Sequence, residues 1–186
     1  MPMIRETIVI TSDAQGRAHI APIGLIADGA DWVIAPFRPS TTLDNLEAVR
    51  FATANHTDDV RVFAGCLTGR RDWPLEASDA VPVARLAGAL AHLELAVIDV
   101  KEDAERPRFR CRVVKEAAHA PFPGFNRAKA AVIEAAILVS RLGRLPRERI
   151  EREMAYLQSS IDKTAGPMEL EAWGWLTDRV RAHFGP

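Results

Sequence analysis

The chain has 186 residues, enough for one domain with a proper core or for a barrel-sized domain that carries a smaller appendage. Apolar residues make up 48% of it, which predicts a folded globule, and 24 Lys and Arg nearly balance 25 Asp and Glu. This balance excludes the electrostatic footprint of a dedicated nucleic-acid binder. The N-terminus lacks the apolar core of a signal peptide, and no later window is apolar enough to span a bilayer, so we expect a cytoplasmic protein without membrane contact.

Strand patterns dominate from Glu6 to Lys115. A β-branched run at 7–11, a turn at 13–16 and apolar runs at 18–26 and 31–37 predict an antiparallel meander. Further strands are expected at 51–55, 89–100 and 108–115, with short helices at 42–50 and after Asp59 and an acidic loop at 74–82. In the last strand Phe109, Cys111 and Val113 alternate with arginines, so one face is expected to be core and the other basic.

After residue 124 the apolar period changes from two to about 3.6 and stays there to the end. Three stripes follow one another, beginning at Ala128, Ile150 and Leu170, with Gly143 to Pro146 and Gly166-Pro167 between them in the order typical of helix ends. Strands first and helices afterwards predict an α+β fold, a small antiparallel barrel with a C-terminal three-helix appendage. We place the division at residues 1–120 and 121–186.

Two familiar kinds of active site find no support in the sequence. The cysteines, Cys66 and Cys111, lie far apart without a CxxC spacing, and the five histidines are scattered, so neither a disulfide framework nor a metal site is expected. No GxSxG or comparable setting supplies a nucleophile. The sequence therefore assigns no catalytic residue.

The stretch "APFRPSTTLDNL" at 35–46 presents Arg38 and the hydroxyls of Ser40, Thr41 and Thr42 just before a helical pattern. One interpretation is a helix cap by Ser40 or Thr41, with Asp44 as the capping-box partner of Thr41. One cap uses one hydroxyl, however, and a helix N-terminus favours an anion. The second interpretation is a phosphate site, in which Arg38 adds a charge-assisted donor to the hydroxyls and backbone N–H groups.

A polar cluster follows directly after the strand at 51–55. Thr57 or Asp58 is expected to start the next helix, which leaves Asn55 unexplained. An amide at a strand end presents a donor and an acceptor together, which suits the polar edge of a planar ring.

Two other segments carry alternatives of the same kind. Ala21, Pro22, Ile23 and Gly24 form a strand of small and ring-closed residues, either an edge strand or bulge, or a place where a flat ligand approaches the backbone. Arg127 and Lys129 put two cations into the first turn of a helix, where they oppose the helix dipole. An anion would offset them, although a solvated helix start also explains Lys129.

The order of these parts resembles the flavin reductase-like branch of the FMN-binding split-barrel family over most of residues 4–115. Segments 124–129 and 163–167 also resemble a subfamily with a C-terminal helical unit, of the domain of unknown function 447 type. The resemblance implies FMN at a homodimer interface, with its phosphate at the hydroxyl-rich helix start and its ring against the small-residue strand. The cofactor-binding residues it implies, together with our own assignment of the last two, are Ala21, Pro22, Ile23, Gly24, Arg38, Ser40, Thr41, Thr42, Asn45, Asn55, Thr57, Asp58, Arg127 and Lys129.

The function that the resemblance implies is an oxidoreductase that passes hydride from NAD(P)H or another reduced donor through FMN to a small acceptor. A pterin of one-carbon metabolism is one such acceptor. A protein that only binds, stores or senses FMN is the alternative, and coenzyme F420 in place of FMN is a more remote one. In such flavoproteins the ring carries the chemistry, so missing catalytic residues decide nothing between these hypotheses.

Overall fold

The structure is a computed structural model that describes residues 2–185. Its contacts divide the chain into two compact units, which we call the barrel unit and the helical unit. The barrel unit is Met1–Thr57 with Trp73–Pro121, and the helical unit is Asp58–Asp72 with Phe122–Pro186.

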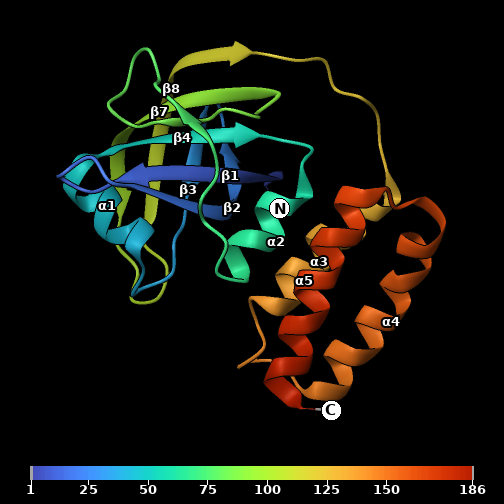
Figure 1. The fold of residues 1–186 in the computed structure, drawn as a ribbon. Helices are drawn as coiled ribbons and strands as arrows, with labels where there is room; N and C mark the ends of the chain where they lie inside the picture. Colours follow the sequence, from blue (N-terminus) through green and yellow to red (C-terminus); the bar gives the residue numbers. More distant parts are fainter. Residues whose placement is uncertain (1, 186) are drawn as a thin grey trace. The chain divides into compact units, whose positions relative to one another are not determined.

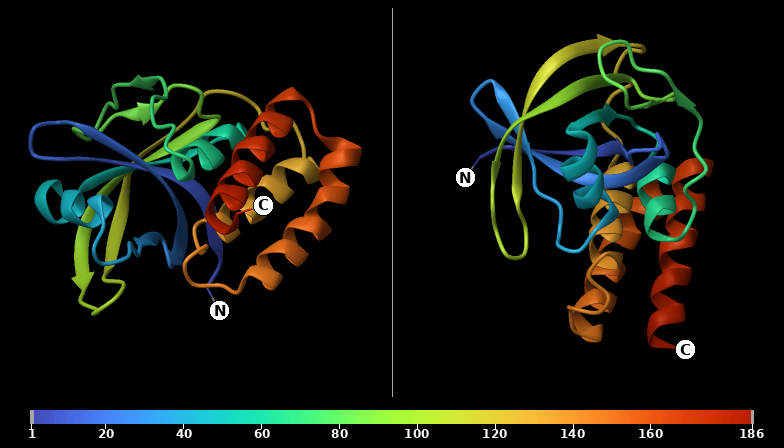
Figure 2. Two further views of the ribbon diagram at one scale, coloured as in Figure 1. Left: turned by 60° about the horizontal axis from the view of Figure 1, so that its bottom comes forward. Right: turned by 90° about the vertical axis from the view of Figure 1, so that its left-hand side faces the viewer.

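The barrel unit is a closed antiparallel barrel in the order β1-β2-β3-β8-β7-β4 (Figure 1). The right-hand view of Figure 2 shows β7 and β8 as a long, bent hairpin, and their pairing shifts register twice. The predicted barrel and its opening meander are confirmed. The strands are β1 Ile4–Ser12, β2 Ala18–Asp28, β3 Asp31–Ile34, β4 Phe51–His56, β7 Ala91–Lys101 and β8 Arg108–Ala118.

Alternation along the strands separates an apolar interior from a polar outer face. On β4, Ala52 and Ala54 belong to the core cluster, and on β7 Leu93 and Leu95 do so, because residues two apart share a face. The helix α1, Thr41–Val49, adds Leu43 and Leu46, which lie one turn apart, to the same cluster. On β8 the predicted core face is confirmed, because Phe109 and Cys111 are fully buried, whereas Arg110 and Arg112 are exposed.

A short hairpin precedes β7 in the chain. It consists of β5 Leu75–Glu76 and β6 Arg85–Leu86. The sequence predicts only a loop at 74–82, because two-residue strands carry no readable period. This segment buries Val81, Val83 and Leu86. It therefore packs against the outer face of β4 and β7, where its backbone bonds Thr53, Asn55 and Glu94.

The helical unit contains α2 Val60–Leu67, α3 Arg127–Val139, α4 Arg147–Thr164 and α5 Pro167–Phe184. In this unit α3 and α5 contact each other, and α2 and α4 each contact both of them. The sequence division at residue 120 assigns α2 to the barrel, whereas its contacts group it with the C-terminal helices. In α5 the predicted stripe is wrong at Leu170, which is exposed, while Glu169 and Ala172 are buried. Among residues 2–185 no helix is long and apolar enough to cross a membrane.

Candidate functional site

The N-terminus of α1 is the first part of the candidate site. Ser40 is the N-cap, and its hydroxyl accepts a hydrogen bond from the backbone N–H of Leu43 at 3.3 Å. The predicted capping box of Thr41 with Asp44 is wrong, because the helix starts one residue earlier than that pairing needs, and Thr41 is exposed. Thr42 is 3% exposed, and its hydroxyl has no hydrogen-bond partner among the residues that the structure describes. The cap thus uses one hydroxyl and leaves that of Thr42 available.

Two further residues predicted for this corner have partners within the barrel unit. The Arg38 guanidinium lies 3.4 Å from a carboxylate oxygen of Glu102 and 3.6 Å from one of Glu47, and its side chain is part exposed. Asn45 is buried and donates from its amide nitrogen to the hydroxyl of Thr11 at 3.0 Å. Asn45 therefore ties α1 to β1, and Arg38 stands at the surface between two acids.

The small-residue strand lies in β2, half-buried, with Ala21 to Gly24 paired to β1 on one side. On the other side β3 pairs only with Ile26–Asp28, so among the described residues this stretch has a free edge, as the edge-strand interpretation predicts. A Cβ built on Gly24 would lie 2.7 Å from Cγ2 of Ile4. The close approach of the Ile4 side chain on β1 therefore explains the glycine at this position, and no ligand is needed to explain it.

Asn55 differs from its prediction. It is fully buried, and its amide nitrogen donates to the carbonyl of Ile8 at 3.0 Å and to the hydroxyl of Thr53 at 3.2 Å. Its amide oxygen accepts from the backbone N–H of Leu86 at 2.8 Å. These bonds hold β4 to β1 and to β6, so the amide faces protein and not a ring edge. The next residue, His56, has a buried Nε2 without a partner among residues 2–185.

The remaining predicted residues divide between the units, with Thr57 in the barrel unit and the other three in the helical unit. The N-cap of α2 is Asp59, not Thr57 or Asp58 as predicted. Lys129 Nζ lies 2.5 Å from a carboxylate oxygen of Asp58 and 4.0 Å from one of Glu169. The structure thus brings Asp58 and Lys129 together as an ion pair, and these two acids offset the lysine charge. Arg127 begins α3 and is exposed.

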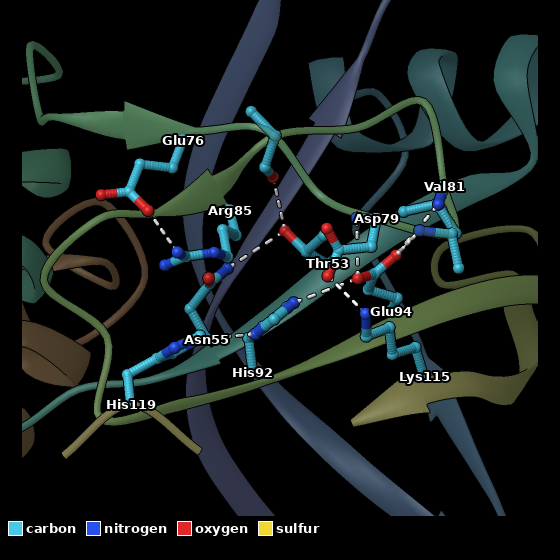
Figure 3. Close-up of polar contacts among 12 residues, drawn as sticks. Thr53, Asn55, Glu76, Asp79, Val81, Arg85, His92, Glu94, Lys115 and His119 are labelled. Carbon is cyan, nitrogen blue, oxygen red and sulfur yellow. Dashed lines mark hydrogen bonds and ion pairs between the residues drawn. The ribbon is translucent and has the colours of Figure 1, made fainter. Parts of the chain in front are cut away.

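The sequence interpretation missed a polar patch on the outer face of β4 and β7 (Figure 3). Thr53 pairs with Glu94 and Asn55 with His92 in the strand register, and all four side chains are at most 1% exposed. Glu94 accepts from the backbone N–H groups of residues 79, 80 and 81 at 3.0, 2.6 and 2.9 Å. The available signal was the alternation of His92 and Glu94 with leucines in an otherwise apolar strand.

From this patch a line of contacts leads outward. His92 Nε2 lies 3.3 Å from Oε1 of Glu94, and His92 Nδ1 lies 2.9 Å from Nε2 of His119, which is exposed. Burial raises the pKa of Glu94, but the hydrogen bonds from the backbone N–H groups and from His92 outweigh it and leave the pKa below its usual value. Glu94 is therefore a buried carboxylate that keeps its charge.

Other titratable groups offer little chemistry. Burial raises the pKa of the Cys66 thiol to about 11 and that of Cys111 to about 12, so both stay protonated at neutral pH. Within residues 2–185 no group of three His, Cys, Asp or Glu residues is arranged to hold a metal ion.

The comparisons with solved structures agree with this fold. An FMN-bound protein of Methanosarcina mazei is 20% identical, and the match covers 96% of both chains with a TM-score of 0.84. A 2-nitrobenzoate 2-nitroreductase of Pseudomonas fluorescens is 17% identical over 64% of this chain and 66% of that one, with a TM-score of 0.53. A Shewanella frigidimarina protein with a split-barrel domain is 14% identical over 62% of this chain and 68% of that one, also at 0.53. At these identities the likeness shows the fold, an α+β split barrel.

Comparison with family models covers most of the chain. No match is found among the curated proteins. The model of the N-terminal domain of a protein of unknown function, DUF447, matches residues 5–120, and a second DUF447 model matches residues 126–178. The chain therefore belongs to the DUF447 family, with both of that family's domains in the order in which the barrel and the C-terminal helices occur here.

Proposed function

We propose that this protein binds FMN and is an oxidoreductase. The observation that carries the proposal is the likeness to the FMN-bound M. mazei protein, which extends over 96% of both chains and includes the DUF447 family model. The other structural relatives lie among flavin-handling proteins and reductases, which favours a redox role. The two free cysteines fit a cytoplasmic protein.

The residues at the N-terminus of α1 fit a phosphate. The first backbone N–H groups of a helix have no partner within the helix, and the helix dipole favours a negative charge there. The hydroxyl of Thr42, which has no partner among the described residues, adds a donor, and Ser40 and Arg38 come just before it in the chain. Arg38 would exchange its contacts with Glu47 and Glu102 for the phosphate.

The free edge of β2 and the end of β4 fit the flat ring. The stretch from Ala21 to Gly24 is half-buried and pairs with no strand of the described residues on one side, so backbone groups face outward there. His56 holds a buried Nε2 that a ligand hydrogen bond would satisfy. We infer that the ring lies between these two elements and that a second copy of the chain covers it in a homodimer.

When bound, FMN would supply hydride chemistry, and the chain's residues would bind it, orient it and exclude water. NAD(P)H or a similar reduced carrier is the proposed donor, and a small molecule such as a pterin is the proposed acceptor. A protein that binds FMN without turnover is the second candidate. One observation favours it: the reductase-like relatives cover only 62–64% of this chain, so about a third lies outside that match.

The phosphate corner is tested by comparing FMN with riboflavin, which lacks the phosphate. The wild-type protein is expected to bind FMN more tightly than riboflavin. Thr42→Ala removes one donor to a charged group, which corresponds to about a 10- to 100-fold loss of FMN affinity. Riboflavin affinity is expected to stay unchanged, and fluorescence quenching on titration measures both.

Thr41→Ala is the matched control, because Thr41 is the exposed neighbour in the same turn. It is expected to leave the affinities for FMN and riboflavin unchanged. If Thr42→Ala weakens FMN and riboflavin equally, or if both threonine variants behave alike, the phosphate does not lie at this helix start.

Turnover is tested with the FMN-loaded protein under anaerobic conditions. The oxidoreductase proposal predicts that NADH or NADPH bleaches the absorbance band of oxidised flavin. FMN binding without bleaching by either nicotinamide would favour the non-catalytic candidate.

A further inference from the structure

Glu94, His92 and His119 form a continuous line from the buried outer face of β7 to the protein surface (Figure 3). Glu94 and His92 are at most 1% exposed, whereas His119 follows β8 and is exposed. We call these three residues the histidine relay. Nothing in the phosphate corner or in the β2 edge uses it.

The hydrogen bonds allow one arrangement of the ring protons when both histidines are neutral. Glu94 already accepts three backbone N–H groups and keeps its charge, so His92 Nε2 must donate to it. A neutral His92 then has a bare Nδ1, which accepts from Nε2–H of His119. This leaves Nδ1 of His119 as an unprotonated nitrogen at the exposed end of the line.

The two rings are well placed to share a proton. Their planes are 14° apart and their centroids 5.1 Å apart. The 2.9 Å contact between nitrogens is shorter than the separation of stacked rings, so the rings meet edge to edge. Burial, Arg85 and His92 lower the pKa of His119, so its neutral, proton-accepting form prevails at neutral pH.

The relay lies at the end of the barrel where the proposed ring site is. Asn55 pairs with His92 across β4 and β7, and His56 with Ala91, which in turn pairs with Ala118 on β8. His119 comes directly after Ala118. The end of β4 and the relay thus share one end of the sheet, with His56 on the face of Ala54 and His92 on the outer face of Asn55.

We propose that His119 is the proton-transfer residue for the ligand reduced at this end of the barrel, and that His92 and Glu94 are positioning residues that stabilise its positive charge. This inference rests on the proposed function for the nature of the ligand, a small molecule that takes up a proton together with hydride. A solvent proton binds to Nδ1 of His119 and then leaves it for the ligand. The two electrons travel only with the hydride from the reduced nicotinamide.

Charged groups from every neighbouring segment face the relay. Arg85 on β6 and Glu76 on β5 form an ion pair, and Asp79 pairs with Lys115 on β8. These two pairs are close to neutral as units. Glu94 is thus the one fully buried charge in direct contact with a relay histidine among the described residues.

The test is a pH titration of the histidine side chains by NMR, on ¹⁵N-labelled protein without added flavin. The expected result is that His92 and His119 both carry the neutral proton on Nε2, and that on acidification the new proton appears on Nδ1 of His119. Glu94→Gln removes the stabilising charge and is expected to lower the proton affinity of the pair at least tenfold, about one pKa unit.

Asp79→Asn is the matched control, because its exposed carboxylate lies in the same segment and is screened by solvent. It is expected to change the proton affinity less than threefold. A neutral His119 protonated on Nδ1, or a Glu94→Gln titration equal to that of wild type, would overturn the relay. The wild-type proton positions decide the question even if Glu94→Gln does not fold.

A second readout uses the pH dependence of anaerobic FMN reduction by NADPH. The wild-type rate is expected to fall as pH rises through the His119 pKa, and His119→Gln to remove that dependence. An unchanged pH profile in His119→Gln would contradict the proton-transfer role. Failure to bind FMN would instead show in the flavin titration and would leave the NMR result standing.

Discussion

Gly24 lies where β2 passes the Ile4 side chain on β1. The space at this contact leaves room for glycine but not for a larger side chain. A Cβ at this position would lie 2.7 Å from Ile4 Cγ2, closer than carbon atoms approach without a shift. Ile4 is half exposed, so its side chain can move at a moderate cost.

We expect Gly24→Ala to lower the free energy of unfolding by about 1–2 kcal/mol through this overlap. Ile4→Ala removes the obstructing methyl group, so in the double variant the effect of Gly24→Ala should nearly vanish. Urea denaturation of the four proteins measures the coupling. Additive effects of the two substitutions would show that the clash is not what requires glycine.

Some residue roles could be predicted from the sequence and others could not. A cap at Ser40 follows from local composition alone, because a helix start needs only its own neighbours. Asn55 could be recognised as an unusual strand-end amide, but its partner, the Leu86 backbone, lies 31 residues away. The sequence therefore identified a residue with a special role and assigned it the wrong partner.

The segment between β4 and β7 is held by polar contacts as well as by burial. Glu94 binds three successive backbone N–H groups, Thr53 donates to the carbonyl of Ala84, and Asn55 accepts from Leu86. Because the pKa of Glu94 in the folded protein lies below its usual value, its charge stabilises the fold.

This carboxylate's contribution is fully present above the ordinary glutamate pKa of about 4.3 and is lost as pH falls through the lower folded pKa. We expect Glu94→Gln to destabilise the protein by about 2–3 kcal/mol at pH 7 and by less at pH 3. Hydrogen exchange should show faster exchange at the amides of residues 79–81. A stability difference that does not shrink on acidification would contradict this role.

Elements with a long, clear period were predictable, and short ones were not. The six barrel strands and the five helices follow from alternation and from the 3.6-residue period. The two-residue strands β5 and β6 offer no period, and their place is set by side chains on β4 and β7. Grouping α2 with the C-terminal helices depends on contacts with α3 and α5, which are distant in sequence.

The whole molecule combines two compact units, and the family match includes both. The order of the elements was enough to predict a small antiparallel barrel with C-terminal helices, because it reflects local periodicity. The split barrel itself was predicted from the resemblance to the FMN-binding family. The proposed ligand site was harder to predict, because its residues come from α1, β2 and β4, and their free hydrogen-bonding groups are visible only in three dimensions. The Thr42 hydroxyl and the His56 Nε2, which have no partner within residues 2–185, are two such groups.

The central claim is that this protein binds FMN, and a thermal-shift titration of the flavin-free protein tests it most directly. The account predicts that Tm rises with FMN concentration in the saturable manner of a ligand that binds only the folded state, with a matching change in the flavin spectrum. A Tm that stays constant at every FMN concentration, with an unchanged flavin spectrum, would contradict it.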